Sequence, residues 1–116
     1  MVEVIDGKAL YGGRHLGDWA SEMADLIAER FDVTRIVLFG SVARGDDGPD
    51  SDIDLLVVMP IVGRRGDAAA SVMKALRGVP VPVNVVVVDS TRLDEQARVP
   101  GIIRVAMREG RTLRES

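Results

Sequence analysis

The chain has 116 residues, enough for one domain, because domains cluster near ~100–150 residues, and no shift in composition marks a second unit. Its composition, 47% hydrophobic and 28% charged, is typical of a globular chain with a packed core. The absence of cysteine excludes disulfide scaffolds, thiolate metal sites and thiol nucleophiles, and it fits a reducing cytoplasm, where we expect the protein to be located. The net charge of −3 argues against bulk binding to nucleic-acid backbone, and no apolar run approaches the ~18 residues of a membrane span.

The first half of the chain predicts one helix and two strands. Glycines break any period over residues 1–14, so we expect an irregular arm or a small strand there, followed by a domain over residues 15–116. Apolar side chains then recur at spacings of three and four over residues 16–31, which predicts an amphipathic helix with Asp18 as its N-cap. Two β-branched runs follow and predict two strands that form a hairpin-like pair, at residues 34–39 and 53–59.

The second half predicts one more strand among helices. Good helix formers at 67–76 predict a helix, and the run at 81–88 is so apolar on both faces that we expect a central strand. The rest is expected to be helical from Thr91 to Pro100 and again at 102–107, with Leu113 packing the tail. This order of elements predicts an α+β fold with a small mixed β-sheet flanked by helices.

The side chains most able to do chemistry lie at the ends of the first two predicted strands. Asp52 and Asp54 alternate along the start of a strand, so they project from the same side, and carboxylate oxygens are ligands that Mg²⁺ prefers. Gly40 ends the preceding strand and lets a phosphate approach the backbone, and Ser41 adds a hydroxyl where a short helical turn opens. An Asp-x-Asp pair alone is read more simply as turn or cap residues, but its combination with Gly-Ser favours a nucleotide site.

Two further side chains need an interpretation. Arg44 lies one turn beyond Ser41 and is expected to reach a triphosphate, where its guanidinium neutralises charge. His15 has no serine or second histidine at a useful spacing, so we expect a surface or capping role for it.

The segments 38–45 (Leu-Phe-Gly-Ser-Val-Ala-Arg-Gly) and 51–57 (Ser-Asp-Ile-Asp-Leu-Leu-Val) carry a resemblance that covers the chain from about Leu16 to its end. The chain resembles the minimal nucleotidyltransferase domains of the DNA polymerase β superfamily. The resemblance implies the polymerase-β-like fold, with Gly40 and Ser41 contacting the phosphates of ATP or another nucleoside triphosphate. It also implies that Asp52 and Asp54 bind the catalytic Mg²⁺ ions, of which there can be two.

The resemblance fails at one position. A third catalytic carboxylate normally comes from the next strand, and the matching position holds Asn84, whose amide lends a neutral oxygen but cannot accept a proton as a general base. Asp89 is no replacement, because strand alternation turns it to the opposite face. Two alternatives therefore stay open: a transferase that tolerates Asn84 with a weakened second metal site, or a catalytically weak module that binds nucleotide or a partner.

The function implied by the resemblance is the transfer of a nucleoside monophosphate, AMP from ATP, to a hydroxyl of a partner. The short members resemble antitoxin-like partners of small all-helical HEPN toxins, so the expected partner is a HEPN-like helical protein, and association with further copies of this chain is compatible with the sequence. The sequence leaves open the acceptor, the nucleotide preference and the oligomeric state.

Overall fold

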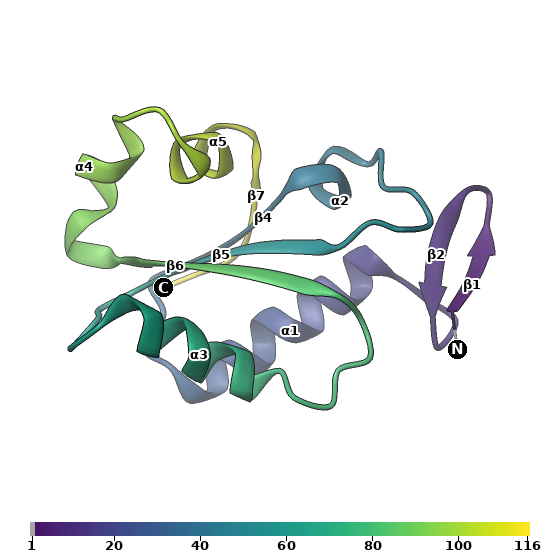
Figure 1. Cartoon of the computed structure of the whole chain (residues 1–116), viewed down its shortest axis with the longest axis horizontal. Helices are drawn as coiled ribbons and strands as arrows, with labels where there is room; N and C mark the ends of the chain where they lie inside the picture. The colour runs from purple at the N-terminus through teal and green to yellow at the C-terminus, as the bar shows by residue number, and fades with distance from the viewer. Residues whose placement is uncertain (1) are drawn as a thin grey trace.

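A computed structural model describes residues 2–116, and its centre is a mixed four-stranded sheet (Figure 1). Its strands are β4 (Arg35–Phe39), β5 (Ile53–Met59), β6 (Val83–Asp89) and β7 (Arg111–Glu115). They lie in the order β6-β5-β4-β7, in which β5 and β6 run parallel and the other two pairs are antiparallel. The expected α+β fold with a small mixed sheet is confirmed.

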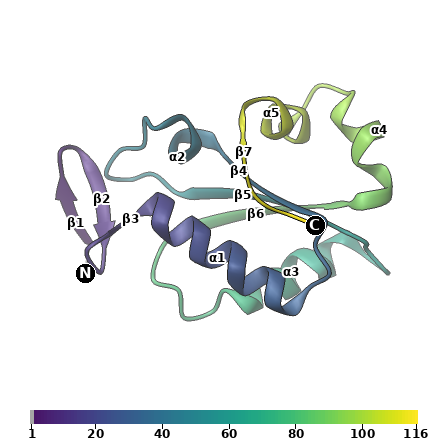
Figure 2. The same cartoon turned by 180° about the vertical axis from the view of Figure 1, so that it is seen from behind.

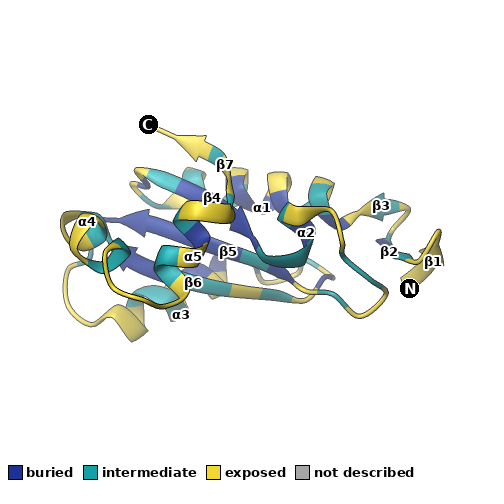
Figure 3. Ribbon diagram, turned by 90° about the horizontal axis from the view of Figure 1, so that it is seen from above, coloured by how far each residue is buried: buried dark blue, intermediate teal, exposed yellow. Residues whose placement is uncertain are grey.

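Helices cover both faces of this sheet (Figures 1 and 2). One face carries α1 (Leu16–Arg30) and α3 (Arg65–Ala75), and the other carries α2 (Gly40–Arg44), η1 (Ser90–Arg92), α4 (Leu93–Ala97) and α5 (Ile102–Glu109). Strand alternation divides the core accordingly: Leu55 and Val57 face α1 and α3, whereas Leu56 and Val58 face α5. The two inner strands of this sheet, β4 and β5, are its most buried part (Figure 3).

The N-terminal segment forms a second, three-stranded antiparallel sheet where we expected an irregular arm or a small strand. Its strands are β1 (Val2–Ile5), β2 (Lys8–Tyr11) and β3 (Arg14–His15). Asp6 and Gly7 both have positive φ, 53° and 78°, which is the backbone of a tight hairpin turn. The indole Nε1 of Trp19 in α1 donates to the Tyr11 carbonyl over 2.8 Å, so the hairpin is tied to the first helix.

The start of α1 differs from the prediction. The helix begins at Leu16, so His15 occupies the N-cap position and Asp18 lies in the first turn instead of capping it. There the negative charge of Asp18 still favours the helix, because the helix dipole is positive at that end. His15 is exposed at the cap position, in agreement with its expected role, although its side chain makes no capping hydrogen bond.

The prediction of a central strand at 81–88 is wrong, because β6 is at the edge of the sheet. Helices cover both faces of β6, and this explains its run of valines. An apolar run of this kind does not indicate whether a strand has a hydrogen-bonded neighbour on one edge or on both. The tail around Leu113, expected to pack without a named element, is the strand β7, and Leu113 is partly buried against the core as expected. Within residues 2–116, no helix is long and apolar enough to cross a membrane.

Leu55→Ala tests the core. Leu55 is fully buried in the central strand β5, so the substitution leaves a cavity and should lower the free energy of unfolding by about 2–5 kcal/mol in urea denaturation. Val62→Ala is the matched control, because Val62 is fully exposed and its change should lie within about 0.5 kcal/mol. Equal effects of the two substitutions would contradict the described core.

Candidate functional site

The register between β5 and β6 brings two of the predicted site residues together. Asp54 of β5 lies opposite Asn84 of β6 in the parallel ladder. Both point to the α2 and α5 side of the sheet, because they share the alternation of Leu56 and Val86, which pack on that side. Asp52 lies just before β5 begins and is exposed.

The amide of Asn84 links the two carboxylates. Its Nδ2 donates to Asp52 Oδ2 over 3.3 Å and to Asp54 Oδ1 over 3.1 Å. Both acids therefore lie on one side of the strand and reach one point in space, as the alternation predicted. Because the amide has a donor nitrogen at one end and an acceptor oxygen at the other, a half-turn of the amide presents oxygen to the same point.

Gly40 forms the other wall around Asp54. Phe39, the last residue of β4, pairs with Asp54, so α2 begins directly beside this carboxylate. Gly40 has φ +76°, and a Cβ built on it collides with the Asp54 carboxylate, at 3.1 Å from Cγ. Glycine therefore suits this position for two reasons: its backbone has positive φ, and a Cβ there would push the Asp54 carboxylate aside.

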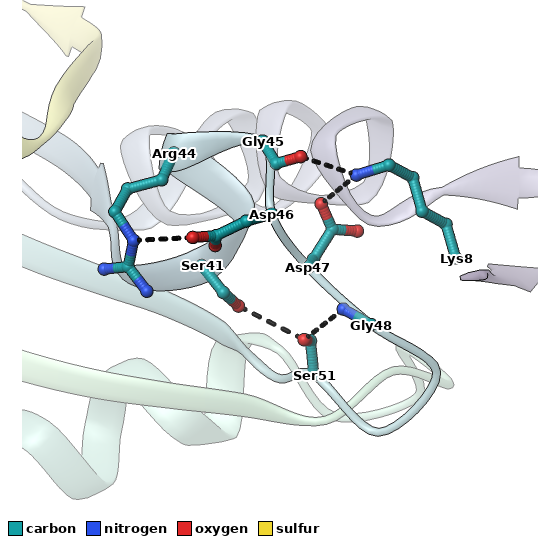
Figure 4. Close-up of polar contacts among 8 residues, drawn as sticks. All are labelled: Lys8, Ser41, Arg44, Gly45, Asp46, Asp47, Gly48 and Ser51. Atoms are coloured by element: carbon teal, nitrogen blue, oxygen red, sulfur yellow. Dashed lines mark hydrogen bonds and ion pairs between the residues drawn. The ribbon is translucent and has the colours of Figure 1, made fainter. Parts of the chain in front are cut away.

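Ser41 is held next to the pair through a second serine. The Ser41 and Ser51 hydroxyls are hydrogen-bonded over 3.2 Å, and the Gly48 amide donates to Ser51 Oγ over 2.8 Å (Figure 4). Ser51 directly precedes Asp52 in the chain. The loop over residues 45–51 therefore positions both the Ser41 hydroxyl and the first carboxylate.

Arg44 is not among the residues brought together. It lies at the end of α2, and its Nε donates to Asp46 Oδ2 over 3.2 Å at the surface (Figure 4). Its side chain is 49% exposed, so the contact with Asp46 is a weak competitor for an anionic ligand. A role for Arg44 at a triphosphate stays a prediction that requires this ion pair to open.

Asp89 has a structural role at the far end of β6. Its carboxylate accepts from the Thr91 backbone N–H over 3.1 Å and caps η1. That backbone hydrogen bond is the main reason that the pKa of Asp89 is lowered, because it stabilises the charged form. Asp89 is five residues beyond Asn84 on the same strand, and it takes no part in the acidic pair.

Sequence reasoning missed Lys8 and Asp47. Lys8 Nζ donates to Asp47 Oδ1 and to the Gly45 carbonyl, both over 2.8 Å (Figure 4). No local pattern indicates this contact, since it joins β2 to the loop after α2 across nearly forty residues.

The donor set fits a divalent cation that also has substrate ligands. The described residues 2–116 contain no group of three or more His, Cys, Asp or Glu that could hold a metal ion. Asp52 and Asp54 supply two carboxylates at one point, and Mg²⁺ usually takes one or two carboxylates together with substrate phosphates and water. The pair can therefore hold a cation if a phosphate completes the ligands.

Comparisons with known proteins identify the family and support the fold. A family model described as "Nucleotidyltransferase domain" matches residues 20–113, whereas a search of curated proteins gives no match. A solved candidate nucleotidyltransferase from Sulfolobus solfataricus is 28% identical, with a TM-score of 0.59 over 82% of this chain and 76% of that one. A mutant of the toxin–antitoxin MntA–HpeT is 17% identical, with a TM-score of 0.51 over 84% and 73% of the two chains, and it shows similarity of fold.

Gly40→Ala tests the contact between the glycine and the acid. The added Cβ displaces the Asp54 carboxylate, so the affinity for Mn²⁺, measured by electron paramagnetic resonance, should fall by at least about tenfold. Gly78→Ala is the matched control, since Gly78 also has positive φ, +95°, but a Cβ there meets nothing within 4 Å. In both variants, backbone strain should lower the free energy of unfolding by about 1–2 kcal/mol. An unchanged Mn²⁺ affinity in Gly40→Ala would show that the contact does not matter for the cation.

Proposed function

The chain belongs to the nucleotidyltransferase domain family, and we propose that it transfers a nucleoside monophosphate, AMP from ATP, to a hydroxyl group of a partner in a Mg²⁺-dependent reaction. One observation carries the proposal: Asp52 and Asp54 converge on a single amide nitrogen, and Asp54 lies in the space that a Cβ on Gly40 would fill. Two carboxylates at one point, beside a strand end that is followed by glycine and serine, suit a nucleotide whose phosphates share a metal ion.

Each residue of the site has a defined task in this proposal. Asp52 and Asp54 hold the Mg²⁺, which when bound neutralises the charge on the phosphates. Gly40 gives room to the Asp54 carboxylate and presents its backbone to the phosphate chain. Ser41 offers its hydroxyl as a donor once the nucleotide replaces Ser51 as its partner. The acceptor oxygen bonds to the α-phosphorus, the bond from that phosphorus to the bridging oxygen breaks, and pyrophosphate leaves.

The proton of the acceptor hydroxyl has no dedicated base at Asn84. An amide cannot take a proton at neutral pH, so the proton passes to a carboxylate of the pair or to solvent. Asn84 instead orients Asp52 and Asp54, because its one nitrogen donates to both. This arrangement predicts slower transfer than a site with three carboxylates.

The same contact supports a second candidate function. Asn84 donates a hydrogen bond to each acid, which partly satisfies the two carboxylates without a metal. These hydrogen bonds are sufficient for a module that binds nucleotide or a partner with little or no transfer. The two candidates differ in whether a labelled AMP group becomes attached to an acceptor.

The acceptor in the proposal is a hydroxyl on a small, all-helical HEPN-like protein. Support comes from the resemblance to short nucleotidyltransferase domains and from a similar fold in the toxin–antitoxin MntA–HpeT. The lack of cysteine supports a cytoplasmic location for such a pair.

Asp52→Asn and Asp54→Asn test the transfer directly. Each change keeps the size of the side chain and removes one negative charge at the cation, so AMP transfer from labelled ATP to the helical partner should fall by at least about 100-fold. Isothermal titration should show weaker Mg–ATP binding in the same variants. Asp50→Asn is the control, because Asp50 is exposed in the same loop, and its transfer rate should match that of the unaltered chain. Full transfer in both site variants would overturn the proposal.

Asn84→Asp separates the two candidate functions. A third carboxylate adds charge for the cation and a base for the hydroxyl proton, so transfer should accelerate by about 10–100-fold if the protein is a transferase. The measurement is the single-turnover rate with saturating Mg–ATP. Binding of Mg–ATP without transfer, unchanged by this substitution, would support the binding module instead.

A further inference from the structure

Lys8 joins the N-terminal sheet to the loop that carries the site. Its ammonium group donates to the Asp47 carboxylate and to the Gly45 carbonyl at the end of α2, both over 2.8 Å (Figure 4). We propose that Lys8 is a positioning residue: it fixes the loop over residues 45–51 and thereby sets the affinity of the site for Mg–ATP. This inference rests on the proposed function, and it concerns a residue outside the span 20–113 that the family model matches.

The sheet that carries Lys8 is itself firmly held. Ala9 and Leu10, the next two residues of β2, are buried, with exposed fractions of 0% and 6%. The Trp19 indole of α1 donates to the Tyr11 carbonyl, and the Arg14 guanidinium lies 4.4 Å from the centre of the Trp19 ring. Lys8 therefore extends from a strand that is held in place, and its two hydrogen bonds restrict the loop.

The loop has few other means of holding its shape. Between α2 and β5, Pro49 and Asp50 are exposed, and no regular helix or strand spans residues 45–52. Three backbone hydrogen bonds, from Gly45 to the Val42 carbonyl, from Asp46 to the Ser41 carbonyl and from Ser51 to the Gly48 carbonyl, are supplemented by the hydroxyl contacts of Ser51. The hydrogen bonds of Lys8 connect this loop to the separate N-terminal sheet.

The contact differs from an ordinary surface ion pair. The Asp47 side chain is only 9% exposed, whereas the surface pair of Arg44 and Asp46 is 49% and 63% exposed. A carboxylate removed from water needs its partner, because leaving it unpaired costs more than losing an exposed pair. Lys8 also binds the carbonyl at the C-terminal end of α2, where a helix favours a positive charge.

The path from Lys8 to the nucleotide site consists of successive contacts. Lys8 holds Gly45 and Asp47; the next residue, Gly48, donates to Ser51 Oγ; and Ser51 binds Ser41 and precedes Asp52. If this loop is not ordered in advance, nucleotide binding must order it. The apparent affinity is then the intrinsic affinity multiplied by the fraction of molecules whose loop is already ordered for binding. Removal of Lys8 should therefore weaken binding without removing any group that contacts the nucleotide.

Lys8→Met tests the proposal in the 116-residue chain, with Lys74→Met as the matched control. Lys74 is the other lysine, exposed on α3, so its substitution removes the same charge away from the loop. Lys8→Met should raise the dissociation constant of Mg–ATP and the KM for ATP by about tenfold, with kcat unchanged, because a competent fraction is lost. Lys8→Arg should restore most of the affinity, since its guanidinium can still donate to both acceptors.

Hydrogen exchange tests the loop without any ligand. In Lys8→Met, the amides of Gly48 and Ser51 should exchange about tenfold faster, while amides of β5 keep their protection. Unchanged exchange at these two amides overturns the proposal, as does faster exchange with unchanged Mg–ATP affinity. If the unaltered chain binds no Mg–ATP, the proposed function fails, and the link from loop to nucleotide affinity fails with it. If the unaltered chain binds and Asp52→Asn does not, the proposed function stands and the Lys8 variants alone decide the positioning role.

Discussion

The parallel register of β5 and β6 is the constraint on which the site depends. It places Asn84 opposite Asp54, from where one amide nitrogen reaches both Asp54 and Asp52. Two like charges so close together repel each other, and the amide donors offset part of that repulsion. Gly40 lies against the other side of Asp54, so this carboxylate is held between a glycine and an amide. A shift of one residue in the register would turn Asn84 to the opposite face of the sheet and leave the acids without this donor.

Asn84 stands where the resemblance implies a third acid, and this difference would change the electrostatics of the proposed site. Two carboxylates balance the charge of one Mg²⁺, whereas three favour a second cation. A neutral amide orders the pair and can turn its oxygen inward, but it offers neither the charge nor the base of a carboxylate. The two proposed functions, a transferase and a binding module, therefore have the same site geometry. They differ in the rate of the transfer step.

Most of the fold could be predicted from the sequence, because its signals are local. The spacing of Leu16, Trp19 and Met23 predicts α1, and the Asp-x-Asp alternation places both acids on one side of β5. The edge position of β6 could not be predicted, since its valines are covered by helices on both faces and show the pattern of a central strand. The contact of Lys8 with Asp47 was also beyond prediction, because it depends on how two separate sheets are arranged in space.

We propose that a cation and the phosphates of ATP meet at the point bridged by Asn84. A crystal structure of this chain with Mg²⁺ and an ATP analogue that resists cleavage between the α- and β-phosphorus tests this most directly. We expect a metal ion bound to Asp52 and Asp54, phosphates beside Gly40 and Ser41, and the Asn84 nitrogen no longer donating to both acids. A nucleotide bound elsewhere, with the Asn84 amide still spanning the two carboxylates, would contradict it.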